Sequence, residues 1–142
     1  MPVHPILVHF PIALLVLSFI FEFFELFYKD KFKNASIFLS ALALFFSLLS
    51  VQTGNIDSQT LNLNEEAKIV LNNHQSNANF FLFTLSVIFL FKLYNILKKK
   101  EVKPKSFFIL LFFYAVALFF VFRTVYFGVK LVYDLGAGVK LK

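Results

Sequence analysis

The last long apolar stretch of the sequence, residues 107–127, reads FFILLFFYAVALFFVFRTVYF and carries a single charged side chain, Arg123. At about 1.5 Å per residue this stretch forms a helix roughly 32 Å long, close to the thickness of the hydrocarbon core of a bilayer. Similar stretches precede it at about residues 10–28, 35–51 and 80–97. We therefore predict an all-α membrane protein with a single membrane domain over residues 1–142, in which four transmembrane helices form an up-down bundle.

The composition of the chain agrees with this prediction and excludes several classes of protein. Of the 142 residues, 59% are hydrophobic and only 15% are charged, whereas soluble domains carry about a quarter charged residues. The chain has no cysteine, which excludes disulfide frameworks, zinc ribbons, thiolate-bound clusters and haem attached through CxxCH. It also lacks a Gly-x-Ser-x-Gly sequence, a phosphate loop and HExxH, so no motif predicts an enzyme.

The basic residues predict the orientation in the membrane. The connectors after the first and third spans hold eight lysines, which are Lys29, Lys31, Lys33, Lys98, Lys99, Lys100, Lys103 and Lys105. The opposite side holds at most four, which are Lys68, Lys130, Lys140 and Lys142. By the positive-inside rule both short connectors are cytoplasmic, so both termini are expected in the periplasm of a bacterial inner membrane. Because the net charge of +6 follows this topology, no nucleic-acid partner is expected.

The first span is expected to stay in the mature protein. It has no Lys or Arg before it and no small-x-small cleavage site after it, whereas a secretory signal peptide has both.

The connector between the second and third spans predicts a further helix. Residues 55–103 contain neither Pro nor Gly, and Asn62 with Glu65 resembles a capping pair, so a helix is expected to begin near Leu63 and to run into the third span. At helical spacing Ala67, Val70, Leu71 and His74 share one apolar face. We predict an amphipathic helix on the outer face of the bundle, with His74 about 9 Å above Phe80.

The first span begins with two prolines and two histidines, His4-Pro5 and His9 to Pro11. Pro5 suits a first helical turn, whereas Pro11 removes a hydrogen bond and makes the start of the span irregular. His4 and His9 are about 140° apart around a helix, so at most one of them faces the bundle. His9 is favoured, because His4 stands before Pro5, where a cap or a free terminus is expected.

Charged side chains inside the spans are costly and should face the bundle. Arg123 lies near the depth of the histidines, and the spans offer no carboxylate at that depth, so a ligand carboxylate is its expected partner. At the inner end Glu22 is expected to pair with Lys92 and Glu25 to reach the interface, with a proton path as the alternative.

One face of the second span consists of small residues at helical spacing, which predicts close packing against a neighbouring helix. These residues are Ser36, Ser40, Ala43, Ser47 and Ser50.

Residues 4–15, HPILVHFPIALL, resemble the opening of a family of small bacterial inner-membrane proteins of unknown function. Further similar pieces are Thr53-Gly54, His74 and the C-terminal sequence GVKLVYDLGAGV, residues 128–139. Members of that family occur beside or fused to Rieske-type and cytochrome-like modules, which implies a redox role. Many members have a basic or histidine residue where this chain has Asp134 and Leu135.

Three functions remain open at this point. In the first, His9 and His74 ligate a b-type haem for electron transfer, with Arg123 on a propionate and His4 as the alternative ligand. In the second, the same histidines bind copper or zinc, with Asp57 or Asp134 as a possible further ligand. In the third, the chain is a non-catalytic accessory subunit. The expected partners are the lipid bilayer, a redox protein in the periplasm or membrane, and a second copy of the chain.

Overall fold

A computed structural model describes residues 3–28, 31–98 and 104–138 of the chain. Its helices are α1 (His4–Leu7), α2 (His9–Glu25), α3 (Lys33–Gln59), α4 (Glu65–Leu97) and α5 (Pro104–Val129), followed by a π-helical turn, η1 (Lys130–Asp134). The predicted positions Lys29, Lys99, Lys100, Lys103, Val139, Lys140 and Lys142 lie outside the described residues.

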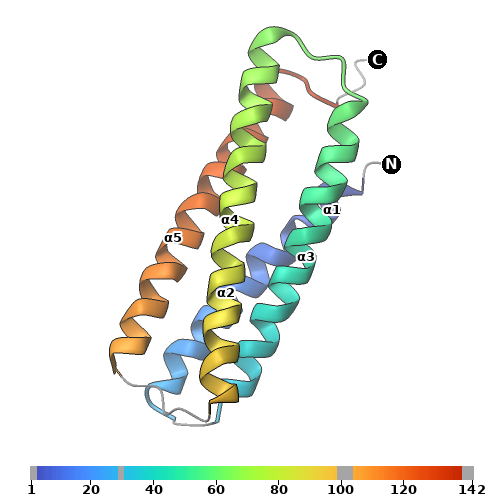
Figure 1. Cartoon of the computed structure of the whole chain (residues 1–142). Helices are drawn as coiled ribbons and strands as arrows, with labels where there is room; N and C mark the ends of the chain where they lie inside the picture. The colour runs from blue at the N-terminus through green and yellow to red at the C-terminus, as the bar shows by residue number, and fades with distance from the viewer. Residues whose placement is uncertain (1–2, 29–30, 99–103, 139–142) are drawn as a thin grey trace.

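The four long helices form the predicted up-down bundle, in which α3 lies between α2 and α4, and α5 packs against α4 (Figure 1). Figure 1 also shows α1, η1 and the α3–α4 turn at one end of the bundle. We call this end the upper end and the opposite end the lower end. Four helical segments of the described chain are long and apolar enough to cross a membrane.

The helices are longer than the apolar stretches of the sequence. α3 continues to Gln59, and α4 is a single helix from Glu65 to Leu97. The predicted outer-face amphipathic helix is therefore the first part of α4, with Ala67 and Val70 buried. Its N-cap is Asn64, whose side chain accepts a hydrogen bond from the Ala67 backbone N–H at 2.8 Å, so the predicted capping by Asn62 is wrong.

The start of the first span is broken in the way that Pro11 predicts. Because Pro11 has no N–H to give to the carbonyl of Leu7, and its ring crowds that carbonyl, a continuous helix is disfavoured. α1 ends at Leu7 and α2 begins at His9. The interruption is confined to Val8, whose φ of −63° and ψ of −23° stay helical. His4, two turns before buried Pro11, therefore keeps the phase of the buried face of α2.

The core lies along the axis of the bundle. Leu15 of α2, Ala43 of α3, Ile88 of α4 and Ala117 of α5 are at most 1% exposed. The small-residue face of α3 is buried along its whole length, as predicted. Large side chains such as Phe83 and Phe122 point outward, where the hydrocarbon of a bilayer would surround them.

Candidate functional site

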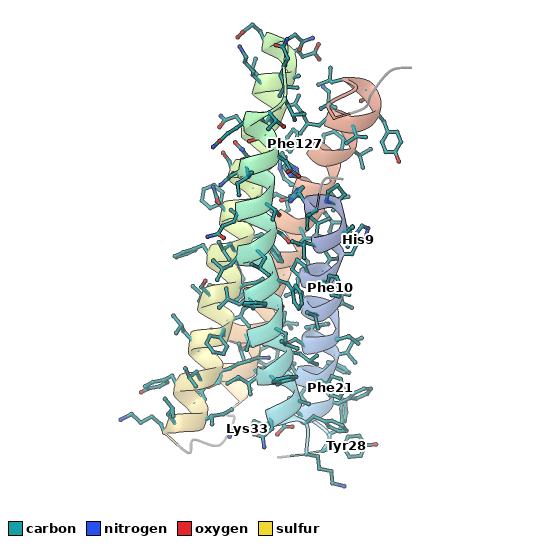
Figure 2. All side chains as sticks on the ribbon, turned by 90° about the vertical axis from the view of Figure 1, so that its right-hand side faces the viewer. His9, Phe10, Phe21, Tyr28, Lys33 and Phe127 are labelled. Atoms are coloured by element: carbon teal, nitrogen blue, oxygen red, sulfur yellow. The ribbon has the colours of Figure 1, made fainter. Side chains whose placement is uncertain are left out.

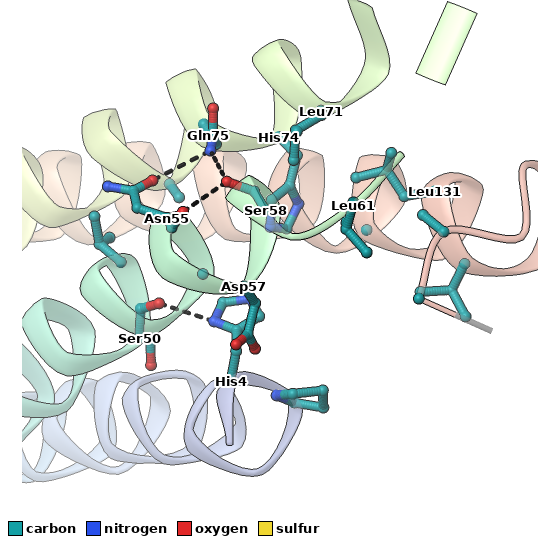
Figure 3. Close-up of a pocket in the computed structure, with 18 of the residues that line it drawn as sticks. His4, Ser50, Asn55, Asp57, Ser58, Leu61, Leu71, His74, Gln75 and Leu131 are labelled. Atoms are coloured by element: carbon teal, nitrogen blue, oxygen red, sulfur yellow. Dashed lines mark hydrogen bonds between the residues drawn. The ribbon is translucent and has the colours of Figure 1, made fainter. Parts of the chain in front are cut away.

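A pocket of about 590 Å³ opens at the upper end of the bundle, and its lining is mostly apolar (Figure 3). Residues of every helix except α2 line it, together with η1 and the C-terminal tail. Gln75 forms part of the polar side of the pocket, because its amide donates to Asn55 Oδ1 and to Ser58 Oγ, both at 3.2 Å (Figure 3). Asp57 is the acidic residue of the lining.

His4 enters the pocket from α1. Its Nδ1 lies 2.8 Å from the backbone carbonyl oxygen of Ser50 in α3. Since a carbonyl oxygen only accepts, Nδ1 carries the proton and Nε2 keeps its lone pair. The ring lies against Gly54, where an added Cβ would be 2.8 Å from His4 Cε1. This close approach explains why position 54 has no side chain.

His74 enters the pocket from α4 and is held in the same manner. Its Nδ1 lies 2.9 Å from the carbonyl oxygen of Thr124 in α5, and a Cβ added to Gly128 would be 3.2 Å from its Cε1. His74 lies outside the apolar stretch of the third span. Burial lowers the pKa of His74 below its ordinary value of 6.5, the hydrogen bond to Thr124 partly opposes this, and nearby His4 lowers the pKa further. The imidazole is therefore held in its neutral form.

The two imidazoles form a pair. Their ring centroids are 6.2 Å apart and their planes are 85° to each other. Within the described residues, neither Nε2 has a hydrogen-bond partner. A neutral imidazole with Nδ1–H bonded to a backbone carbonyl and Nε2 free is the usual state of a metal-ligating histidine. The described residues contain no group of three or more His, Cys, Asp or Glu side chains that could hold an ion.

Two of the predicted site residues lie elsewhere. His9 is exposed on the outer side of α2 (Figure 2), so the prediction that His9 faces His74 is wrong, and His4 takes that place. Arg123 is exposed as well, and its guanidinium lies over the rings of Phe119 and Phe127, at 6.0 and 5.2 Å from their centroids. The prediction that Arg123 faces the bundle is therefore also wrong.

The C-terminal tail closes one side of the pocket. After η1 the backbone N–H of Ala137 donates to the carbonyl of Leu131 at 2.8 Å. Gly136 and Gly138 have φ of +63° and +76°, in the left-handed region that favours glycine. These two glycines turn the tail so that Ala137 and Gly138 line the pocket, whereas Asp134 is exposed and not part of the lining.

The motifs that are far apart in the sequence therefore meet at one place. His4 and Pro5, Gly54, His74, Gly128 and the tail all line the same pocket. Of the two carboxylates predicted as possible metal ligands, Asp57 lines the pocket and Asp134 does not. Sequence reasoning missed the packing roles of the two helical glycines, although a glycine inside a helix is itself a sign of a close approach.

The charged side chains at the lower end also lie together. The predicted pair of Glu22 and Lys92 is present at 2.8 Å, with both side chains buried. Glu25 is buried too and accepts a hydrogen bond from the backbone N–H of Phe32 at 2.9 Å, so it does not extend to the interface as predicted.

One family model matches almost the whole chain, over residues 1–141, and it is described as "Predicted membrane protein (DUF2231)". No curated protein and no solved structure matches the chain.

Proposed function

Because the chain belongs to this family of predicted membrane proteins, whose description gives a location and no activity, we propose from the pocket itself that it is a membrane electron-transfer protein or a subunit of a redox complex. In this proposal the pocket at the upper end holds a b-type haem, and His4 and His74 are its ligands. His4 thus replaces the expected ligand His9.

The observation that carries the proposal is the spacing of the two imidazoles. A metal–nitrogen bond to histidine is about 2.0 Å long, so two imidazoles that would hold the same metal ion must lie close together in one pocket. The observed separation of 6.2 Å fits this requirement.

The rest of the pocket fits a cofactor as well. Its volume of about 590 Å³ lies within the range of about 300–1,000 Å³ found for ligand and cofactor sites. Leu61, Leu71 and Leu131 supply apolar walls. The carbonyls of Ser50 and Thr124 hold the orientation of the two rings. When bound, haem would supply one-electron transfer, at a potential that depends on its axial ligands and on this apolar surrounding.

A histidine site for copper or zinc is the second candidate, and the charge of the pocket favours it. Asp57 lines the pocket, while the described lining residues include no Lys or Arg. Haem propionates usually need a cationic or hydrogen-bonding partner, and exposed Arg123 is not among the lining residues. In the haem proposal, the amides of Asn55 and Gln75 have to take this part.

The lysine-rich connectors support a periplasmic location for the site. If these connectors are cytoplasmic, the upper end of the bundle is periplasmic. A redox partner would then approach from the periplasm or along the outer leaflet of a bacterial inner membrane.

A pyridine haemochrome assay together with metal analysis separates the candidates. The protein is purified in detergent from cells that are supplied with a haem precursor. The haem proposal predicts one haem b per chain. Copper or zinc at one per chain without haem would select the second candidate, and neither haem nor metal after haem supplementation would overturn both.

A further inference from the structure

The second polar centre of the molecule lies inside the bundle near the lower end. Lys92 of α4 is 6% exposed, and its Nζ is 2.8 Å from Glu22 Oε2 and 2.6 Å from the hydroxyl of Tyr114. It also bonds to the hydroxyl of Ser36 and lies 3.2 Å from those of Ser18 and Ser40. We call these six residues the lysine cluster.

The cluster has more acceptors than the lysine can use. An ammonium group has three N–H donors, and five oxygen atoms surround Nζ. The hydroxyls also bond to one another and to the backbone, as Ser18 does to Tyr114 at 2.6 Å and Ser36 does to Glu22 at 2.9 Å. Protons therefore have several alternative positions within one connected set of oxygen and nitrogen atoms.

Helix packing alone does not explain why these polar residues occupy the interior of the bundle. A buried ion pair is expensive to desolvate, and apolar residues of similar size are often at least as stabilising. Ionisable residues inside a membrane protein are costly, and paths for ions or protons are among the functions that they mark.

A small cavity lies beside the cluster on the side of the lower end. This cavity of about 20 Å³ is lined by Glu22, Glu25, Lys33, Lys92 and Asn95. A water molecule needs about 10–15 Å³ and two to four polar partners, so the cavity can hold one. Glu25 lies on the same face of α2 as Glu22, one turn closer to the lower end, and bonds to the backbone of the α2–α3 connection.

The opposite side of the cluster is closed by the core. Leu15, Leu85, Ile88 and Ala117 are at most 1% exposed and lie between the cluster and the upper pocket. Tyr114 of the cluster and Thr124, whose carbonyl holds His74, are ten residues apart on α5, which is about 15 Å along a helix.

We propose that Glu22 and Lys92 form a proton-exchange site that is open to water at the lower end and closed toward the upper end. A hydronium ion at the cavity gives its proton to the Glu22 carboxylate and leaves as water. Lys92 stays an ammonium and keeps its bonds to Tyr114 and Ser36. The pair then carries one positive charge, and release of the proton to water reverses the step.

The titratable groups around Glu22, with Lys92 included, come from all four long helices. They are Glu25 of α2, Lys33 of α3, Lys92 itself from α4 and Tyr114 of α5. The proposal does not depend on haem in the upper pocket.

Infrared difference spectra of the full chain in membranes, recorded between alkaline and acidic pH, test the proton step. Acidification should produce a carboxylic acid C=O band in the wild type that is missing in Glu22→Gln and present in Glu65→Gln, because Glu65 is an exposed carboxylate of α4. The double variant Glu22→Gln/Lys92→Met keeps a neutral pair and serves where the single variant does not fold. A permanent ion pair would give the same spectrum in the wild type and in the Glu22 variants, which would overturn the proposal.

Proteoliposomes with an enclosed pH-sensitive dye test the closure. A one-sided site takes up a proton without conducting, so vesicles with the wild-type chain should keep an imposed pH difference as long as protein-free vesicles. Faster loss of the pH difference would contradict a site that is closed toward the upper end.

Discussion

Single residues fix the geometry of the upper pocket. Each imidazole is bonded through Nδ1 to a backbone carbonyl of another helix, His4 to α3 and His74 to α5. Gly54 and Gly128 leave room for the two rings. The hydrogen bonds select the tautomer and the glycines select the position, so four residues together direct two free Nε2 atoms to one pocket.

The packing of His4 on Gly54 can be tested by Gly54→Ala. The new Cβ would lie 2.8 Å from His4 Cε1 and push the ring away from the Ser50 carbonyl. Overpacking of this kind costs about 1–3 kcal/mol. Unfolding in detergent should therefore show that Gly54→Ala destabilises the wild type. In a His4→Ala background, the same change should stabilise the protein by about 1 kcal/mol, since alanine is the better helix former. The same effect in both backgrounds would contradict the contact.

The pKa of His74 predicts the pH dependence of stability. Burial lowers its pKa in the folded protein, so below about pH 6.5 the unfolded chain binds more protons than the folded one. The free energy of unfolding should then fall as the pH drops below this value. His74→Asn should reduce this loss in unfolding measured across the pH range. An unchanged pH dependence in the variant would show that another group causes it.

Residue positions were the hardest part to predict from the sequence. The periodicity of α4 placed His74 on the inner face correctly. The choice between His4 and His9 could have been made from helical phase, because His4 lies two turns before buried Pro11 and shares its face, whereas His9 does not. Arg123 failed for a different reason, because a long side chain can lie on aromatic rings and reach the interface instead of facing inward.

At the level of the helices, hydropathy predicts the central part of each helix but not the residues at which it begins and ends. All four spans were predicted, yet α3 and α4 continue well beyond their apolar stretches at the upper end. Those extensions carry many polar side chains, so hydropathy does not mark them as helices, whereas the absence of Pro and Gly from residues 55–103 indicates that a helix can continue there. The extensions form the α3 and α4 walls of the pocket.

The extension of α4 can be tested by two neighbouring substitutions. Val70 is 5% exposed and Ile69 is 64% exposed. Val70→Asp buries an unpaired charge and should destabilise the protein by more than about 2 kcal/mol, whereas Ile69→Asp should change stability by less than about 0.5 kcal/mol. Unfolding in detergent measures both. Equal effects would contradict a packed helix at this end.

The whole molecule has two polar centres at opposite ends of an apolar core. The pair of Glu22 and Lys92 was predicted, because their depths in two spans matched. From the sequence, the serines around Lys92 indicate only a packing face. A stripe of small residues looks the same whether it serves close helix packing or a hydrogen-bonded cluster. The one feature of the sequence that indicates the cluster is that these hydroxyls lie at the same depth as Lys92.

Topology is tested by a reporter fused after Lys142. With cytoplasmic lysine-rich connectors, a reporter that works only in the periplasm should be active, and one that works only in the cytoplasm should be inactive. Cytoplasmic activity would place the upper pocket on the other side of the membrane.

The visible spectrum of the purified protein, reduced minus oxidised, tests the central claim most directly when it is recorded for three histidine variants beside the wild type. A haem held by His4 and His74 should give a low-spin spectrum that His4→Ala and His74→Ala each abolish or convert. His9→Ala should leave it intact, because that side chain lies outside the pocket. Loss of the spectrum with His9→Ala, or its persistence in both of the other variants, would contradict the account.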